Sequence, residues 1–271
     1  MNELNMRKNC GITYFSIPAF EETGLVISCF ASRIGGVSKK PYSSLNLGVK
    51  TADSRANIQK NYELLFKAIN IPIENSVLSD QVHKDNIKII TTADRGKGII
   101  RDSNIFEVDG MITNEKGIAL VTHYADCVPI YLLDPVNKVI GLVHAGWKGT
   151  VLRIAQKAIL KMQESFGTEP KNCLAAIGPS IGKCCYEVDE PVINKFNQNF
   201  TNLSKYVFFK ENNRYNLDLW EANKNQLEEI GILQRNIIIS NLCTHCNNHL
   251  FFSHRSEEGI TGRMAAVLQL K

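Results

Sequence analysis

The chain has 271 residues, of which 44% are hydrophobic and 21% charged, so it can bury a sizeable core. Its formal net charge of +4 is too small for a nucleic-acid-binding protein, and no apolar run approaches the ~18 residues of a membrane span. The polar start of the chain, residues 1–8, leads into no signal-peptide pattern. The protein is therefore expected to be cytoplasmic, with its eight cysteines reduced.

In chain order, the predicted elements alternate between strands and helices without a regular βαβ repeat. Short apolar runs predict strands at residues 25–30, 77–83, 86–91, 117–122, 128–133, 139–144, 237–241 and 264–270. Helical spacing of apolar residues predicts three helices, capped by Asp53, by Thr150, and by Asp218 in a capping box with Glu221. We therefore expect a mixed α/β (α+β) fold in a single domain, residues 1–271, with a mixed or antiparallel sheet and helices packed on it.

The two strongest apolar runs, 128–133 and 139–144, are joined by residues 134–137, Asp-Pro-Val-Asn, whose composition is typical of a β-turn. A hairpin that closes directly across this turn places Cys127 opposite His144. Opposed residues have Cβ atoms roughly 4.5–5.5 Å apart. At that distance a thiolate and an imidazole can share a metal ion or form a nucleophile–base pair. Taken singly, each residue also fits a structural role in the core.

The segment that follows His144 favours an open site. Residues 145–149, Ala-Gly-Trp-Lys-Gly, are mostly small, and the helix predicted from Thr150 presents free backbone N–H groups to an anion.

These residues carry a resemblance to a known family. Residues 80–83 (DQVH), 125–129 (ADCVP) and 143–150 (VHAGWKGT) closely resemble the YlmD/YfiH family. Further matches run along the chain at residues 33–38, 44–48, 108–110, 177–182, 186–188, 252–255 and 261–264. Members of this family were long labelled polyphenol oxidases or laccase-domain proteins, and were later recognised as purine nucleoside phosphorylases with adenosine deaminase activity.

The resemblance implies a zinc site made of His83, Cys127 and His144, with copper as an alternative metal. It also implies phosphorolysis of adenosine, inosine, guanosine and methylthioadenosine, with phosphate as co-substrate and adenosine deamination as a second activity. Three protein ligands leave a fourth position for water or substrate, and zinc can lower the pKa of bound water to about 7. Such a hydroxide can attack C6 of adenine and release ammonia.

Phosphorolysis also needs groups that hold phosphate and ribose. Arg33 and Arg55 are candidate phosphate ligands because a guanidinium binds oxyanions in a fixed fork. Asn46 is a candidate hydrogen-bond partner of ribose or phosphate. Asp126 is a candidate for orienting His144 or for proton transfer, although strand alternation points its side chain to the opposite face. Structural hydrogen bonding or surface charge is the alternative role for all four.

Two cysteine motifs remain outside this site. Residues 243–249 (CTHCNNH) contain a C-x2-C, but no second C-x2-C accompanies it, so we interpret the motif as structural or incidental. The adjacent pair Cys184 and Cys185 is interpreted as packing.

Other functions stay open at this level. A hydrolase or deamidase would use Cys127 as nucleophile and His144 as base without any metal. A copper-dependent phenol oxidase is disfavoured because six histidines are too few for several copper ions. The expected partners are purine nucleosides and phosphate, with no nucleic acid and no membrane, and a homodimer is compatible with the sequence. A silent purine-binding module is the remaining class.

Overall fold

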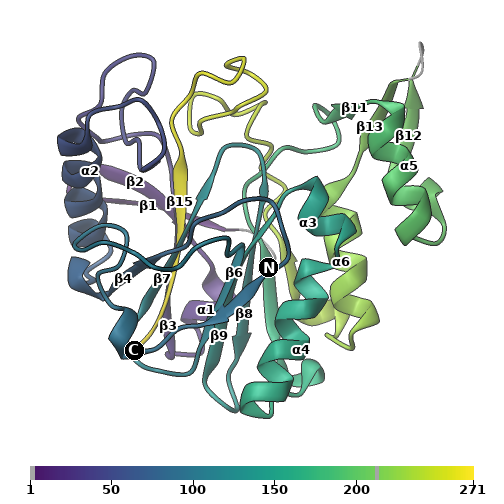
Figure 1. Ribbon diagram of the computed structural model, residues 1–271, viewed down its shortest axis with the longest axis horizontal. Coiled ribbons are helices and arrows are strands. Elements are labelled where there is room, and N and C mark those ends of the chain that lie inside the picture. Colours follow the sequence, from purple (N-terminus) through teal and green to yellow (C-terminus); the bar gives the residue numbers. More distant parts are fainter. Residues whose placement is uncertain (1–3, 211–213) are drawn as a thin grey trace.

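The computed structural model describes residues 4–210 and 214–271, which form two six-stranded sheets and a smaller three-stranded sheet (Figure 1). The first sheet has the order β1 (Asn5–Asn9), β2 (Ile12–Ser16), β3 (Val26–Ala31), β15 (Met264–Leu270), β7 (Ala119–Tyr124) and β4 (Ser76–Leu78). The second has the order β14 (Ile237–Ile239), β10 (Leu174–Ile177), β8 (Val128–Asp134), β9 (Val139–Ala145), β6 (Gly110–Thr113) and β5 (Ile87–Ile89).

The third sheet has the order β11 (Glu187–Val188), β13 (Arg214–Leu217) and β12 (Val207–Lys210). Most neighbouring strands are antiparallel, whereas β4–β7, β5–β6 and β10–β14 pair in parallel. The predicted mixed α/β class is therefore confirmed.

The helices pack on the sheets in different places. They are α1 (Pro18–Glu21), α2 (Arg55–Ala68), α3 (Trp147–Val151), α4 (Ile154–Phe166), α5 (Glu190–Asn199) and α6 (Leu219–Glu229). Helix α2 covers the outer face of the first sheet, and α4 and α6 cover that of the second, so the layers run helix, sheet, sheet, helix (Figure 1). Helix α1 adds Phe20 to the cluster between the two large sheets, and α5 packs against β13. Within the described ranges, none of the helices combines the length and apolar character needed to cross a bilayer.

Both faces of the central strands are buried, which explains their unbroken apolar runs. In β15, Ala265 and Val267 face α2, while Ala266 and Leu268 pack against the second sheet. The alternation follows from the period of two along a strand. The layer between the sheets is consequently mostly apolar, and two buried tyrosine hydroxyls cross it: Tyr131 donates to the carbonyl of Cys29 and Tyr124 to that of Val143.

Two predicted helix starts differ from the structure. Helix α2 is capped by Ser54 rather than Asp53, because the Ser54 hydroxyl accepts the backbone N–H of Asn57. Thr150 lies inside α3, whose N-cap is Gly146, and its hydroxyl accepts a hydrogen bond from Asn223. The expected anion-binding helix start at Thr150 is therefore wrong. The predicted Asp218 cap of α6 is confirmed.

Candidate active site

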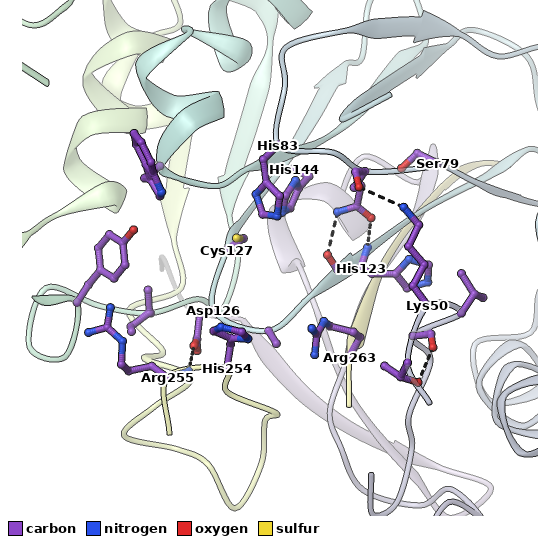
Figure 2. A pocket seen from close by; sticks show the side chains of 18 residues that line it. Lys50, Ser79, His83, His123, Asp126, Cys127, His144, His254, Arg255 and Arg263 are labelled. Atoms are coloured by element: carbon purple, nitrogen blue, oxygen red, sulfur yellow. Dashed lines mark hydrogen bonds between the residues drawn. The ribbon is translucent and has the colours of Figure 1, made fainter. Parts of the chain in front are cut away.

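His83, Cys127 and His144 converge on one point of the structure (Figure 2). One potential ligand atom from each lies within 4.8 Å of the other two, and the two imidazole centroids are also 4.8 Å apart. These separations suit a shared ion, since each side chain needs about 2.0–2.3 Å to reach zinc. The three residues of the expected metal site are thus neighbours in space.

His144 is the next-to-last residue of strand β9 and is held by Asp109, the residue before β6. Its Nδ1 donates to Oδ1 of Asp109 at 2.8 Å, and its backbone N–H donates to the Asp109 carbonyl at 2.7 Å. The bond at Nδ1 leaves Nε2 as the ring atom that can bind a metal. Asp109 is fully buried, so this orientation is fixed.

The loop that carries His83 wraps around the same carboxylate. Backbone N–H groups of Val82, His83 and Lys84 donate to Asp109 at 2.9–3.1 Å. This wrapping requires a curled chain, and His83 adopts a left-handed φ of 59°. The predicted strand 77–83 is therefore wrong beyond Leu78, where β4 ends. A single buried aspartate positions two of the three residues of the expected metal site.

The hairpin register differs by two residues from the expected one. His144 pairs with Pro129, and Asp134 pairs with Val139. The loop still has four residues, but it is shifted by one position to residues 135–138, and its last residue, Lys138, takes a left-handed φ of 54°. Cys127 precedes β8 and reaches His144 because the chain bends at Asp126, whose φ is 84°. The proximity of Cys127 and His144 is correct, but strand pairing does not cause it.

The charges of Cys127 and His144 depend on each other. Burial raises the pKa of the thiol, but the rings of His144 and His83 more than offset this and bring it to about 6. Burial also disfavours the imidazolium, yet the Cys127 thiolate and the Asp109 carboxylate raise the pKa of His144 to about 9. Cys127 is therefore available as a thiolate at neutral pH, the form that binds metals or attacks carbonyl carbon.

A glycine makes room for this cluster. A Cβ atom on Gly146 would lie 2.9 Å from Nδ1 of His83 and 3.1 Å from Sγ of Cys127. Its φ of −65° is accessible to any residue, so the absence of a side chain here serves space rather than backbone conformation. Two imidazoles and one thiolate form a donor set that fits zinc or copper, and Gly146 leaves space beside them.

The cluster forms part of the wall of a cavity of about 500 Å³. One side of the cavity carries the aromatic rings of Trp147 and Tyr186. Lys50 and Arg263 lie on another side, beyond the metal-ligand cluster (Figure 2). The cavity therefore offers flat aromatic surface and positive charge around one thiolate–imidazole cluster, with Arg255 beside Tyr186 and with Lys50 and Arg263 on the other side.

Asp126 lies beside Cys127, but its carboxylate points away from the two histidines (Figure 2). It accepts hydrogen bonds from the hydroxyls of Thr244 and Ser253 and from the backbone N–H of Arg255, at 2.6, 3.1 and 2.7 Å. These bonds tie the bend before Cys127 to the loops after β14. Asp109, rather than Asp126, orients His144.

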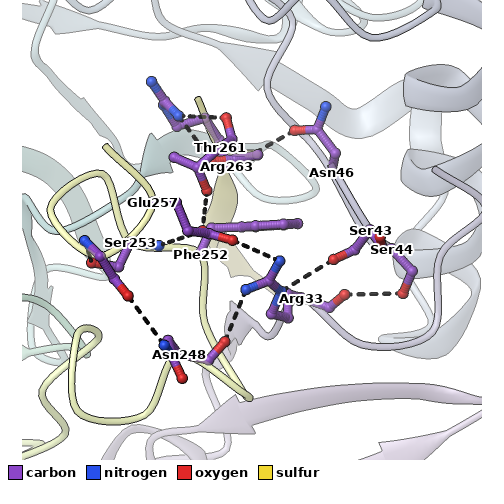
Figure 3. Close-up of polar contacts among 12 residues, drawn as sticks. Arg33, Ser43, Ser44, Asn46, Asn248, Phe252, Ser253, Glu257, Thr261 and Arg263 are labelled. Atoms are coloured by element: carbon purple, nitrogen blue, oxygen red, sulfur yellow. Dashed lines mark hydrogen bonds and ion pairs between the residues drawn. The ribbon is translucent and has the colours of Figure 1, made fainter. Parts of the chain in front are cut away.

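Arg33 lies outside the cavity lining, at the centre of a polar cluster (Figure 3). Its guanidinium donates to the carbonyls of Ser43 and Asn248 and to Oε1 of Glu257, and it stacks on the ring of Phe252 at 4.4 Å. All three guanidinium nitrogens are thus engaged within the protein.

Asn46 and Arg55 are likewise outside the cavity lining. Asn46 is fully buried; its Oδ1 accepts the backbone N–H groups of Gly48 and Arg263, so it joins two loops that border the cavity. Arg55 is exposed at the start of α2 and lines a separate, smaller hollow beside Asp53. The structure therefore does not bring the three expected substrate-binding residues to the metal-ligand cluster.

Sequence reasoning missed Asp109, Lys50 and Arg263. Asp109 and Arg263 lie in matched segments, 108–110 and 261–264, but no spacing rule connects either one to the hairpin. Arg263 donates through Nη1 to the carbonyls of Thr261 and Gly262. Its Nε and Nη2 make no hydrogen bond to the described part of the chain, so they are free to bind an oxyanion.

Comparisons with known proteins place nearly the whole length of the chain in one family. A sequence profile of the family described as "Multi-copper polyphenol oxidoreductase laccase" matches residues 27–271. Purine nucleoside phosphorylase YlmD of Bacillus subtilis is 37% identical over 247 residues, which cover 91% of this chain and 89% of that protein. Purine nucleoside phosphorylase YfiH of Escherichia coli is 30% identical, with 94% and 98% covered.

A solved structure supports the same likeness. The crystal structure of YlmD from Geobacillus stearothermophilus superposes with a TM-score of 0.94 at 35% identity, and the match covers 100% of both chains. The layers and the sheet order described above are therefore shared with a protein of that group.

Proposed function

The chain belongs to the YlmD/YfiH family, whose named relatives are purine nucleoside phosphorylases, and on this basis we propose that it cleaves purine nucleosides with phosphate. The observation that carries the proposal is the convergence of His83, Cys127 and His144 in the wall of a cavity that also holds Arg263. Zinc is the proposed metal. When bound, it supplies a Lewis acid with one open coordination position.

The chain's own residues have separable roles in this proposal. Trp147 and Tyr186 provide flat surfaces for the purine, since aromatic rings stack on bases. Arg263 and Lys50 attract phosphate and hold it against the ribose. Lys50 is itself paired with Asp80, so an incoming phosphate has to compete with that carboxylate. Asp109 keeps the proton of His144 on Nδ1 and Nε2 free.

The proposed substrates are adenosine, inosine, guanosine and methylthioadenosine. Deamination of adenosine is proposed as a second activity, supported by a donor set of three protein ligands, the count typical of catalytic zinc. Copper is the alternative occupant, since it binds such ligands more tightly than zinc. All eight cysteines are free in the structure.

A second candidate function rests on a different reading of the same contacts. Asp109, His144 and Cys127 form a chain of carboxylate, imidazole and thiol, which is the arrangement of an activated cysteine nucleophile. A metal-free hydrolase or deamidase would use it. The two candidates differ in metal dependence, because a zinc chelator abolishes the first activity and leaves the second intact.

The experiment is a product analysis of zinc-loaded protein with adenosine or inosine, with and without phosphate. We expect phosphate-dependent release of the free base and ribose 1-phosphate, lost in Cys127→Ala and retained in Cys10→Ser, a matched change at an exposed cysteine. Inosine formed from adenosine without phosphate would reveal the deaminase. Protein that contains zinc but forms neither product would refute the proposal.

A further inference from the structure

Four other cysteines form a second sulfur cluster. Cys184 and Cys185 lie in the turn after β10, and Cys243 and Cys246 follow β14. Their Sγ atoms all lie within 4.8 Å of one another. Sγ of Cys246 is 3.4 Å from that of Cys185 and 3.7 Å from that of Cys184. Four of the eight cysteines, from segments about sixty residues apart, thus meet at one place.

The backbone holds these two segments in place before any ligand is considered. Strands β10 and β14 are parallel neighbours, so both segments leave the same edge of the second sheet. The pairing continues as an isolated bridge between Ser180 and Cys243. Backbone N–H groups of Gly182 and Cys246 donate to the sulfur of Cys243, the first at 3.3 Å. Such bonds stabilise a thiolate and orient it as a metal ligand.

The sulfur separations match a single tetrahedral ion. Zinc–thiolate bonds of about 2.3 Å place the four sulfurs of a tetrahedral site about 3.8 Å apart. A multinuclear iron–sulfur cluster would put several iron and sulfide atoms between the cysteines and hold them further apart. A disulfide would bring two sulfurs to about 2.05 Å, and all four cysteines are free.

Charge favours the same occupant. Four thiolates within 4.8 Å of one another would repel one another strongly. A divalent cation among them removes the repulsion and allows all four to ionise.

We propose that Cys184, Cys185, Cys243 and Cys246 bind one zinc ion in a closed tetrathiolate site that is separate from the His83–Cys127–His144 cluster. The adjacent pair supplies the half-site that the C-x2-C motif lacked in the sequence. The packing role expected for Cys184 and Cys185 and the incidental role of Cys243 and Cys246 are replaced by this assignment.

This zinc ion ties together two segments that line the cavity. Tyr186 directly follows one pair of ligands, and Arg255 lies in the loop after the other pair. Arg255 donates to the carbonyls of Cys185 and Glu187 and lies over the ring of Tyr186. The site therefore fixes the aromatic wall of the cavity, and a ligand set of four thiolates leaves no open position for substrate.

The first test compares zinc content by mass spectrometry in wild type and in Cys184→Ser/Cys246→Ser, purified identically from zinc-supplemented cells. Both cysteines are exposed, so the serine hydroxyls remain solvated and folding is preserved. We expect the double variant to lose about one zinc ion per chain. Cys10→Ser is the matched control and should lose none. The test measures the difference in zinc content between two proteins that share the His83–Cys127–His144 cluster. The result therefore does not depend on whether that cluster binds zinc.

The second test begins with all four proposed ligands intact. Cys127→Ala, reconstituted with cobalt(II), should show intense thiolate-to-cobalt charge-transfer bands that saturate at about one ion per chain. The bands should vanish when Cys184→Ser/Cys246→Ser is added. Equal zinc content in wild type and double variant, or no thiolate–cobalt bands, would overturn the site. Iron in place of zinc in the purified protein would overturn the assignment of the metal.

Discussion

Replacing Asp109 with asparagine is expected to weaken both the fold and the proposed metal site. Oδ1 of Asp109 accepts from Nδ1 of His144 and from the N–H of His83, and Oδ2 accepts from the N–H groups of Val82 and Lys84. An amide has one oxygen, so in either orientation its NH2 group faces two donors. Two charge-assisted bonds are lost at a fully buried position.

The magnitude follows from these contacts. At about 1.5–3 kcal/mol for each hydrogen bond to a charged group, the free energy of unfolding should fall by about 3–6 kcal/mol. If the NH2 group donates to Nδ1 of His144, the ring proton moves to Nε2, the atom that would bind the metal. Zinc affinity should then fall about 10–100-fold, the usual effect of removing a partner of a ligating histidine.

The assay combines denaturant unfolding with competition for zinc against a chromophoric chelator at fixed pH. Asp102→Asn, which changes an exposed carboxylate in the same stretch of chain, is the control. Wild-type zinc affinity and stability in Asp109→Asn would refute the claim that this carboxylate organises the site.

Three further predictions follow from the structure. Gly146→Ala should reduce bound zinc and turnover with little loss of stability, because the added methyl group lies against two ligand side chains; unchanged zinc content would contradict this. Arg33→Ala should lower the free energy of unfolding by about 1–3 kcal/mol but leave the KM for phosphate unchanged, since its guanidinium is bound internally; a raised KM would return it to the substrate site. Burial lowers the pKa of His123 to about 3, so the folded state stays neutral while the unfolded histidine takes up a proton below about pH 6.5. Stability should therefore fall by about 1 kcal/mol near pH 5.5, and His123→Gln, but not the exposed His249→Gln, should remove that slope.

The apolar runs made the central strands predictable, because both faces of β8, β9 and β15 are buried and leave no polar interruption. The short edge strands and the long loops carried no such signal. The path of residues 79–86 is set by N–H groups that converge on Asp109, a contact with a distant part of the sequence. Local pattern therefore extended that strand too far.

The closeness of the three residues of the expected metal site was predictable, but their surroundings were not. The expected hairpin register placed Cys127 opposite His144, but the real register is shifted, with Lys138 in a left-handed conformation at the turn. The sequence does not reveal this shift, because a lysine in that conformation has no sequence signature. Arg33 fits the composition of an oxyanion site, yet Glu257 and two carbonyls already satisfy it. Only the folded chain shows which cations have free donors.

The position of β15 has a consequence for how the protein is made. This strand lies between β3 and β7, both of which leave the ribosome long before it. Until β15 inserts, β3 and β7 each expose an unpaired edge. Arg263, one residue upstream of β15, is then also absent from the cavity. A chain interrupted before this strand would be both inactive and prone to edge-to-edge aggregation. The first sheet can close only after Arg263 and β15 have been translated.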